Sequence, residues 1–177
     1  MSPSSPALLV LVLASVSGLS APTKLVVLSH GLYGGATNLQ TLEDQLRLSS
    51  DVLVHQSASN EGRTRDGVAA GGSRLASEIR QVIAMEPSLR SLVLVGNSLG
   101  GLYVRYAAAE LLEADSRMAG LDADALVTIG CPHLGVRRHT FLPLPTPVQA
   151  AGSIVAGRTA EDLLMRDASK PAQAPLL

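Results

Sequence analysis

Short apolar runs alternate with longer amphipathic stretches along this chain. Four runs rich in valine, leucine and isoleucine have the length and composition of buried β-strands; they cover residues 25–29, 51–55, 92–95 and 125–129. Between them, apolar residues recur every three or four positions, as on the buried face of a helix, in residues 39–46, 68–83 and 99–111. Strands that are apolar nearly throughout and alternate with helices predict an α/β fold with a doubly wound, mostly parallel sheet.

Polar residues beside these runs predict where helices begin and where loops lie. Thr37-Asn38-Leu39-Gln40 has the form of a capping box, and Asp66 is placed to cap the helix that follows it. Asp122 and Asp124 precede the last apolar run and are therefore predicted to lie in a loop. A further, weakly helical stretch is expected around residues 160–165.

The pentapeptide Gly96-Asn97-Ser98-Leu99-Gly100 lies between a predicted buried strand and a predicted helix. Strand, Gly-x-Ser-x-Gly and helix in this order are typical of a nucleophile elbow, which exposes the serine at the strand's carboxyl end. The hydroxyl of Ser98 would then lie near the positive end of the helix dipole, which favours developing negative charge. The alternatives are a glycine-rich turn that holds a phosphate group and a simple tight turn.

A second glycine-rich loop, which begins at His30-Gly31-Leu32, follows the first predicted strand. In α/β-hydrolases a loop of this kind supplies one backbone N–H of the oxyanion hole, and the residue after the nucleophile supplies the other. We therefore expect Leu32 and Leu99 to be the two donors, through their backbones. His30 is expected to brace the loop by hydrogen bonding and to take no part in the chemistry.

Bulk composition removes several classes of function. With 177 residues the chain is expected to form one domain, and its net charge of −1 gives no electrostatic basis for binding nucleic acid. No apolar run reaches the roughly 20 residues that a spanning helix needs. No spacing of His, Asp and Glu suggests a metal site, so we expect neither a metal nor another cofactor. The chain has a single cysteine, Cys131, which excludes a disulfide within the chain.

The amino-terminal residues have the character of a targeting leader. Residues 1–21 contain an apolar run of signal-peptide length followed by small residues, but no Lys or Arg before it. We expect a secretory leader, hence a secreted protein or one of the endomembrane lumen; an organellar leader and an uncleaved anchor are the alternatives. The domain is expected in residues 22–177, where a proline-spaced apolar segment at 141–147 is either a lid or a connecting loop.

Several sequence blocks together resemble the DUF676 family of serine esterases and lipases. These blocks are His30-Gly31-Leu32, Asn60-Glu61, Thr64-Arg65-Asp66-Gly67, residues 71–76, residues 96–106 and Pro132-His133-Leu134-Gly135. They occur in the family's order and extend from Lys24 towards the carboxyl terminus. The resemblance implies an α/β-hydrolase fold, Ser98 as nucleophile, an acyl ester or lipid as substrate, and peripheral contact with a membrane.

The resemblance also implies that something is missing. In α/β-hydrolases the acid and the histidine of the triad follow the serine in the chain, and in this family they come from later strands than those found here. After Ser98 the candidate bases are His133 and His139. We therefore expect a fragment that lacks its carboxyl-terminal strands, its triad acid and its triad histidine, with His133 as the remaining base candidate.

This expectation leaves enzymatic activity of the chain itself open. The main hypothesis is a serine hydrolase that cleaves acyl esters, and the alternatives are a non-catalytic lipid-binding or decoy product of the same scaffold and an acyltransferase. A sheet without its last strands would leave residues 126–129 as an unpaired edge. We accordingly expect residues 22–177 alone to be poorly soluble and to react weakly or not at all with a fluorophosphonate probe for serine. The oligomeric state is left open.

Overall fold

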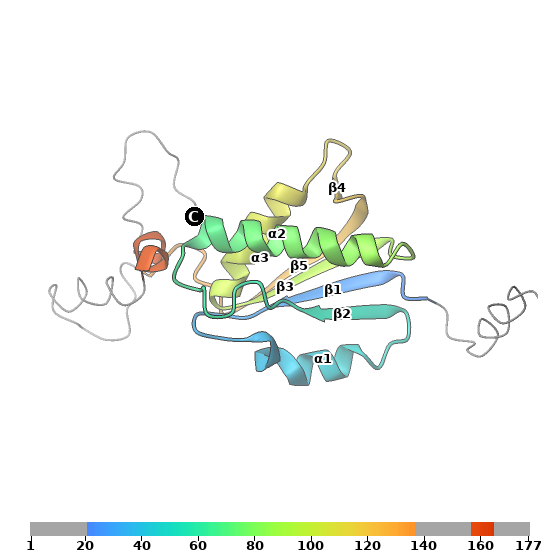
Figure 1. Ribbon diagram of the computed structural model, residues 1–177, viewed down its shortest axis with the longest axis horizontal. Helices are drawn as coiled ribbons and strands as arrows, with labels where there is room; N and C mark the ends of the chain where they lie inside the picture. Colours follow the sequence, from blue (N-terminus) through green and yellow to red (C-terminus); the bar gives the residue numbers. More distant parts are fainter. Residues whose placement is uncertain (1–20, 137–156, 165–177) are drawn as a thin grey trace, which may run out of the picture.

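The computed structural model describes residues 21–136 and 157–164 and contains one mixed, mostly parallel sheet (Figure 1). Its strands are β1 (Lys24–Ser29), β2 (Val52–Gln56), β3 (Ser91–Asn97), β4 (Arg117–Met118) and β5 (Leu121–Ile129). The remaining elements are the 3-10 helix η3 (Ala36–Leu39), the α-helices α1 (Gln40–Leu46), α2 (Val68–Met85) and α3 (Leu99–Leu111), and a short helix over 157–163. The strand order is β2-β1-β3-β5-β4, with every pair parallel except β4–β5. The predicted α/β class and mostly parallel sheet are confirmed.

Both faces of the sheet are covered, which explains why the central strands are apolar throughout. Alternate residues of β1 point to opposite sides: Leu25 and Val27 pack under α2 and α3, whereas Val26 and Leu28 pack against α1. Figure 1 shows α2 and α3 lying together over one face and α1 below the other. The expected apolar face is confirmed, because Leu42 and Leu46 of α1 and Leu39 of η3 pack on the same buried cluster as Val26 and Leu28.

The strand β5 begins earlier than the hydrophobic pattern predicts. Asp122 and Asp124, expected in a loop, lie within β5, so that expectation was wrong. Both are exposed and their carboxylates form ion pairs, Asp122 with Arg117 and Asp124 with Lys24. Backbone pairing with β3 and β4 extends the strand into this polar stretch. Aspartate is a poor strand former. The side-chain pattern therefore predicts the start of the strand only after Asp124, although backbone pairing begins earlier.

The carboxyl-terminal half of β5 forms an edge of the sheet in the described part of the chain. The antiparallel strand β4 covers only Leu121 and Asp122. Further along, Leu126, Val127 and Ile129 are 42%, 43% and 45% exposed, which is unusual for apolar strand residues. The predicted edge over residues 126–129 is thus confirmed. Within residues 21–136 and 157–164, no helix has the length and apolar character needed to cross a membrane. The proposed leader, residues 1–21, lies almost entirely outside the described residues.

The starts of two helices differ from the sequence expectation. The first helical turn begins after Gly35, two residues before the predicted capping residue Thr37. The N–H of Gly35 donates to the side chain of Asn38, but glycine has no side chain to accept in return, so the predicted capping box does not form. Asp66 does not cap α2; its carboxylate pairs with Arg74 at 2.9 Å. The carboxylate of Asp162 accepts from the N–H of Val68 at 2.6 Å instead, so the cap of α2 comes from the 157–163 helix. That helix confirms the helical stretch expected around 160–165 for residues 160–163; residue 165 lies outside the described residues.

Candidate active site

Ser98 stands at a sharp turn between β3 and α3. Its backbone has φ 53° and ψ −122°, a conformation that non-glycine residues seldom adopt. The turn is held by the neighbouring strand, because the Ser98 N–H donates to the carbonyl of Ile129 in β5 at 2.8 Å. Ser98 is also the N-cap residue of α3, so its side chain lies beside the positive end of that helix. The predicted strand-turn-helix context of the nucleophile elbow is confirmed.

Close packing around the elbow explains why it contains so much glycine. A Cβ atom on Gly100 would lie 2.2 Å from the carbonyl oxygen of Ser29 and 2.6 Å from that of His30. Both oxygens belong to backbone, which cannot yield as a side chain can. The first turn of α3 therefore presses directly against the end of β1, and a residue with a side chain cannot occupy this position without moving one of them.

The loop of residues 30–36 lies next to the serine; we call it the oxyanion loop after the role that the sequence predicts for it. A Cβ atom on Gly31 would be 2.9 Å from Ser98 Cβ and 3.4 Å from Ser98 Oγ. The register explains this proximity, since Ser29 at the end of β1 pairs with Gly96 at the end of β3. The expectation that both glycine-rich loops meet at one edge of the sheet is therefore confirmed. His30 is 2% exposed, and its Nδ1 lies 2.9 Å from the carbonyl oxygen of Gly31, so its side chain contacts the loop as expected.

Two backbone N–H groups are available beside Ser98. Leu32 lies in a turn, and no acceptor among the described residues receives a hydrogen bond from its N–H. Leu99 is the first residue of α3, and the first N–H groups of a helix have no acceptor within the helix. These are the two donors expected from the sequence. Their role in binding an oxyanion remains a prediction.

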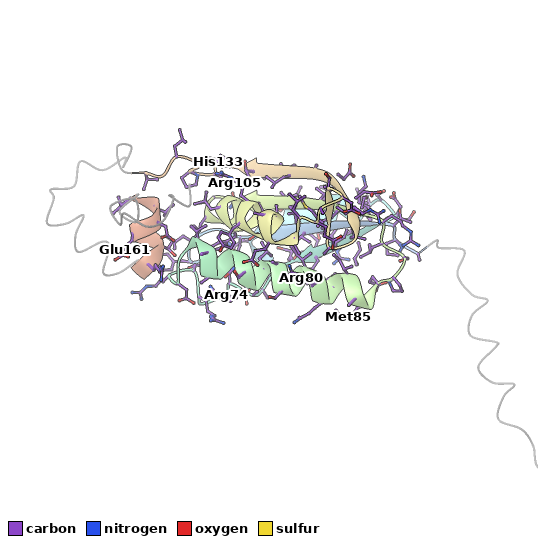
Figure 2. The ribbon with its side chains drawn as sticks, turned by 90° about the horizontal axis from the view of Figure 1, so that it is seen from above. Arg74, Arg80, Met85, Arg105, His133 and Glu161 are labelled. Carbon is purple, nitrogen blue, oxygen red and sulfur yellow. The ribbon has the colours of Figure 1, made fainter. Side chains whose placement is uncertain are left out.

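The ring nitrogens of His133, the candidate base, form hydrogen bonds with residues other than Ser98. Arg105 has donors only, so its Nη1 donates to His133 Nδ1 at 3.1 Å, and the ring proton is then on Nε2. Nε2 donates to Thr128 Oγ1 at 2.9 Å. Figure 2 shows His133 and Arg105 side by side. In the ranges that the structure describes, no histidine forms a hydrogen bond with Ser98 Oγ; the role of His133 as a base stays a prediction, and His139 lies outside those ranges.

The described acidic residues do not complete a catalytic relay. Asp122 pairs in register with Ser91 at the amino end of β3, the end opposite to Ser98. Asp162 is 3% exposed and caps α2. Among residues 21–136 and 157–164, no group of three or more His, Cys, Asp or Glu side chains could hold a metal ion. Cys131 is a free thiol packed against the core, and burial raises its pKa.

A partly buried carboxylate outside the elbow, that of Glu78, organises the loop that leaves β2. Glu78 accepts hydrogen bonds from His55 Nε2 at 2.9 Å, from the Ser57 hydroxyl, and from the N–H groups of Ala58 and Ser59. Burial by itself raises the pKa of Glu78, but these hydrogen bonds outweigh it and lower the pKa to about 2. The loop over residues 57–59 is thus held to α2 by one ionised side chain.

This pKa predicts how stability responds to acid. A carboxyl whose pKa is lower in the folded chain stabilises it fully above its unfolded pKa, here 4.5, and loses that contribution as pH falls towards 2. We expect Glu78→Gln to lower the free energy of unfolding by roughly 2–3 kcal/mol at pH 6 and by much less at pH 3. Urea denaturation at both pH values measures this. The exposed Glu113→Gln variant is the control; an equal deficit of Glu78→Gln at pH 6 and pH 3 would contradict the assignment.

Residues 60–67 form part of the site that the strand and helix patterns did not reveal. Thr64 and Glu61 accept hydrogen bonds from the backbone of the oxyanion loop, at Tyr33 and Ala36. These contacts join residues that are 31 and 25 positions apart, which no local pattern reports. The signal available in the sequence was the pair of blocks Asn60-Glu61 and Thr64-Arg65-Asp66-Gly67, which are among those that resemble a known family.

Comparison with known proteins places this geometry in context. The family model described as "Putative serine esterase (DUF676)" matches residues 20–177. The protein named "Putative lipase ROG1" of Saccharomyces cerevisiae is 31% identical over 147 residues, which are 78% of this chain and 21% of that protein. The propeptide form of the Bacillus licheniformis lipase BlEst2 has a similar fold, with a TM-score of 0.50, 16% identity, and coverage of 85% of this chain and 32% of the lipase.

The family model covers the oxyanion loop, the elbow and residues 60–67 together, and the fold agrees with that of a solved lipase. The chain spans about a fifth of the length of the yeast relative and about a third of the bacterial lipase. With a Gly-x-Ser-x-Gly elbow whose serine has a positive φ, and with a His-Gly loop packed beside it, the chain belongs to the DUF676 family of putative serine esterases.

Proposed function

We propose that the chain carries the nucleophile and the oxyanion hole of a hydrolase that cleaves acyl esters, with lipid esters as the substrate class. In this mechanism Ser98 Oγ attacks the ester carbonyl carbon and the carbonyl oxygen becomes an oxyanion, bound by the N–H groups of Leu32 and Leu99. Collapse of the intermediate expels the alcohol and leaves an acyl-serine, which water then hydrolyses. The proton of Ser98 goes to a general base, which then passes it to the departing alcohol; no hydrogen bond of Ser98 among the described residues identifies this base.

One observation carries this proposal: the contact between Gly31 and Ser98. A Cβ atom at position 31 would lie 2.9 Å from Ser98 Cβ, closer than Cβ atoms come without a shift, so glycine allows the loop to approach the nucleophile this closely. This approach brings the next residue, Leu32, to the edge of the sheet where α3 begins. Two donors converging on one serine are what acyl transfer requires, and losing one donor typically costs about 3–4 kcal/mol of transition-state stabilisation.

The names of the similar proteins support the lipid part of the proposal. Both the yeast relative and the bacterial structure are named as lipases. A lipid substrate also fits peripheral contact with a membrane, and the leader-like residues 1–21 support a secreted or endomembrane location.

Labelling with a fluorophosphonate tests the nucleophile. The full 177-residue chain is incubated with the probe, and the modified residue is identified by peptide mass spectrometry. We expect a slow reaction at Ser98, because no described base activates it, and none in Ser98→Ala. Ser77→Ala, which removes an exposed serine on α2, is expected to label as the unchanged chain does.

The same samples test the substrate class. Release of nitrophenolate from p-nitrophenyl esters of increasing acyl length is expected to depend on Ser98. Labelling that is absent, or that is spread over other serines, would reject the proposal and favour a non-catalytic lipid-binding product of the scaffold. If Ser98 is labelled and the acyl group passes to an added alcohol in preference to water, the result would favour an acyltransferase.

A further inference from the structure

We infer that Thr64 is a positioning residue, whose hydroxyl fixes the oxyanion loop and thereby the N–H of Leu32 relative to Ser98. The inference rests on the proposed function and deepens it by adding a residue that does not touch the substrate. Thr64 is 2% exposed, lies 34 residues before the serine, and its Oγ1 accepts a hydrogen bond from the N–H of Tyr33 at 3.1 Å.

The oxyanion loop needs external support because its backbone is strained. Tyr33, directly after the proposed donor Leu32, has φ 57°, in the left-handed region that tyrosine rarely occupies. The turn is closed by a hydrogen bond from the N–H of Gly34 to the carbonyl of Gly31 at 3.1 Å. A strained residue of this kind persists only where its surroundings determine its conformation. The hydroxyl of Thr64 binds the strained residue itself.

A second hydrogen bond comes from the same segment, residues 60–67, which we call the brace. The carboxylate of Glu61 accepts from the N–H of Ala36, at the far end of the oxyanion loop. Gly35 packs against this carboxylate, since a Cβ atom there would lie 2.8 Å from Glu61 Oε1. The brace therefore holds the loop at two separate points, Tyr33 and Ala36.

The brace is itself anchored to the core of the molecule. Asn60 donates to the carbonyl of Gly71 in α2 at 3.0 Å and accepts from Arg74 Nε at 3.0 Å. Figure 2 shows Arg74 on α2, from which it also donates to the brace carbonyl of Arg63 at 3.0 Å. A segment fixed in this way can impose a conformation on the loop that it contacts.

Thr64 also connects the oxyanion loop to the helix of the nucleophile. Its carbonyl accepts from the hydroxyl of Tyr103 at 3.3 Å and from Thr159 Oγ1 at 2.7 Å. Tyr103 is fully buried on α3, the helix that Ser98 caps. The path from Ser98 through α3, Tyr103 and Thr64 to Tyr33 is continuous, and it sets the position of Leu32 with respect to the nucleophile.

The test compares Thr64→Val, which keeps the shape but removes the hydroxyl, with Thr64→Ser, which keeps the hydroxyl. Two quantities are measured on the full chain: the hydrogen-exchange rate of the Tyr33 amide and the rate of fluorophosphonate labelling of Ser98. In Thr64→Val we expect Tyr33 exchange to accelerate at least tenfold, and labelling to slow about tenfold because the donor is misplaced. Thr64→Ser should stay within twofold of the unchanged chain in both.

Exchange of the Val27 amide in the central strand β1 is the internal reference for global unfolding, and it should not change. Unchanged Tyr33 exchange in Thr64→Val would overturn the inference. Faster Tyr33 exchange with labelling unchanged would also overturn it, because Thr64 would then only stabilise the fold. If the unchanged chain is not labelled at Ser98, the proposed function fails, and the Tyr33 exchange alone decides whether Thr64 holds the loop.

Discussion

Replacing Ser98 by glycine is expected to abolish fluorophosphonate labelling and, at the same time, to make the chain more stable than its Ser98→Ala variant. Both substitutions remove the nucleophile, so neither can form the adduct. They differ in backbone strain, because φ 53° with ψ −122° is unfavourable for alanine but open to glycine. We expect Ser98→Gly to exceed Ser98→Ala by about 1–2 kcal/mol in free energy of unfolding.

The control is a position where the glycine variant is expected to be less stable than the alanine variant. Ser77 lies on the exposed side of α2 with ordinary helical geometry. There glycine should be less stable than alanine by roughly 0.5–1 kcal/mol, because it loses more chain entropy on folding. Urea denaturation of the four variants gives both differences. A Ser98→Gly variant less stable than Ser98→Ala would show that the elbow is not strained.

Replacing Gly100 by alanine is expected to lower the free energy of unfolding by about 3 kcal/mol or more. The added methyl group would lie 2.2 Å from the carbonyl oxygen of Ser29 and 2.6 Å from that of His30, so β1 and α3 must separate. Because this separation moves the oxyanion loop away from Ser98, labelling should also be lost. Denaturation and labelling of the same preparation measure the two effects.

Gly120, between β4 and β5, provides the matched control. It has φ 79°, but a Cβ atom there would meet nothing within 4 Å. Gly120→Ala should therefore lose only about 1 kcal/mol, the cost of the backbone conformation, and keep its labelling. If Gly100→Ala lost no more than Gly120→Ala, the close approach of α3 to β1 would be wrong.

The elbow and the oxyanion loop could be predicted from the sequence because each is defined by neighbouring residues. Strand, glycine-flanked serine and helix occupy one stretch of chain, and parallel strands bring their carboxyl ends to one edge. The apolar faces of α1 and α2 followed from helical spacing in the same way. For these elements local preference and tertiary packing agree.

Other features could not be predicted because they depend on residues far apart. Asp66 was the nearest residue able to cap α2, yet Asp162, 94 positions from Val68, provides the cap. The start of β5 was missed because backbone pairing with β3 and β4 outweighs the low strand preference of Asp122 and Asp124. The contact between Thr64 and Tyr33 joins two loops, for which periodicity carries no information.

The long-range cap of α2 has a consequence for how the molecule assembles during synthesis. The strands β1, β2 and β3 and the helix α2 are synthesised before residues 157–164, which lie later in the chain. Until then, the first turn of α2 lacks the carboxylate of Asp162, and Thr64 lacks the hydroxyl of Thr159. Contacts of such long sequence separation form late because the intervening chain must first be ordered. The scaffold of the nucleophile is thus built early, and the surroundings of the oxyanion loop mature last.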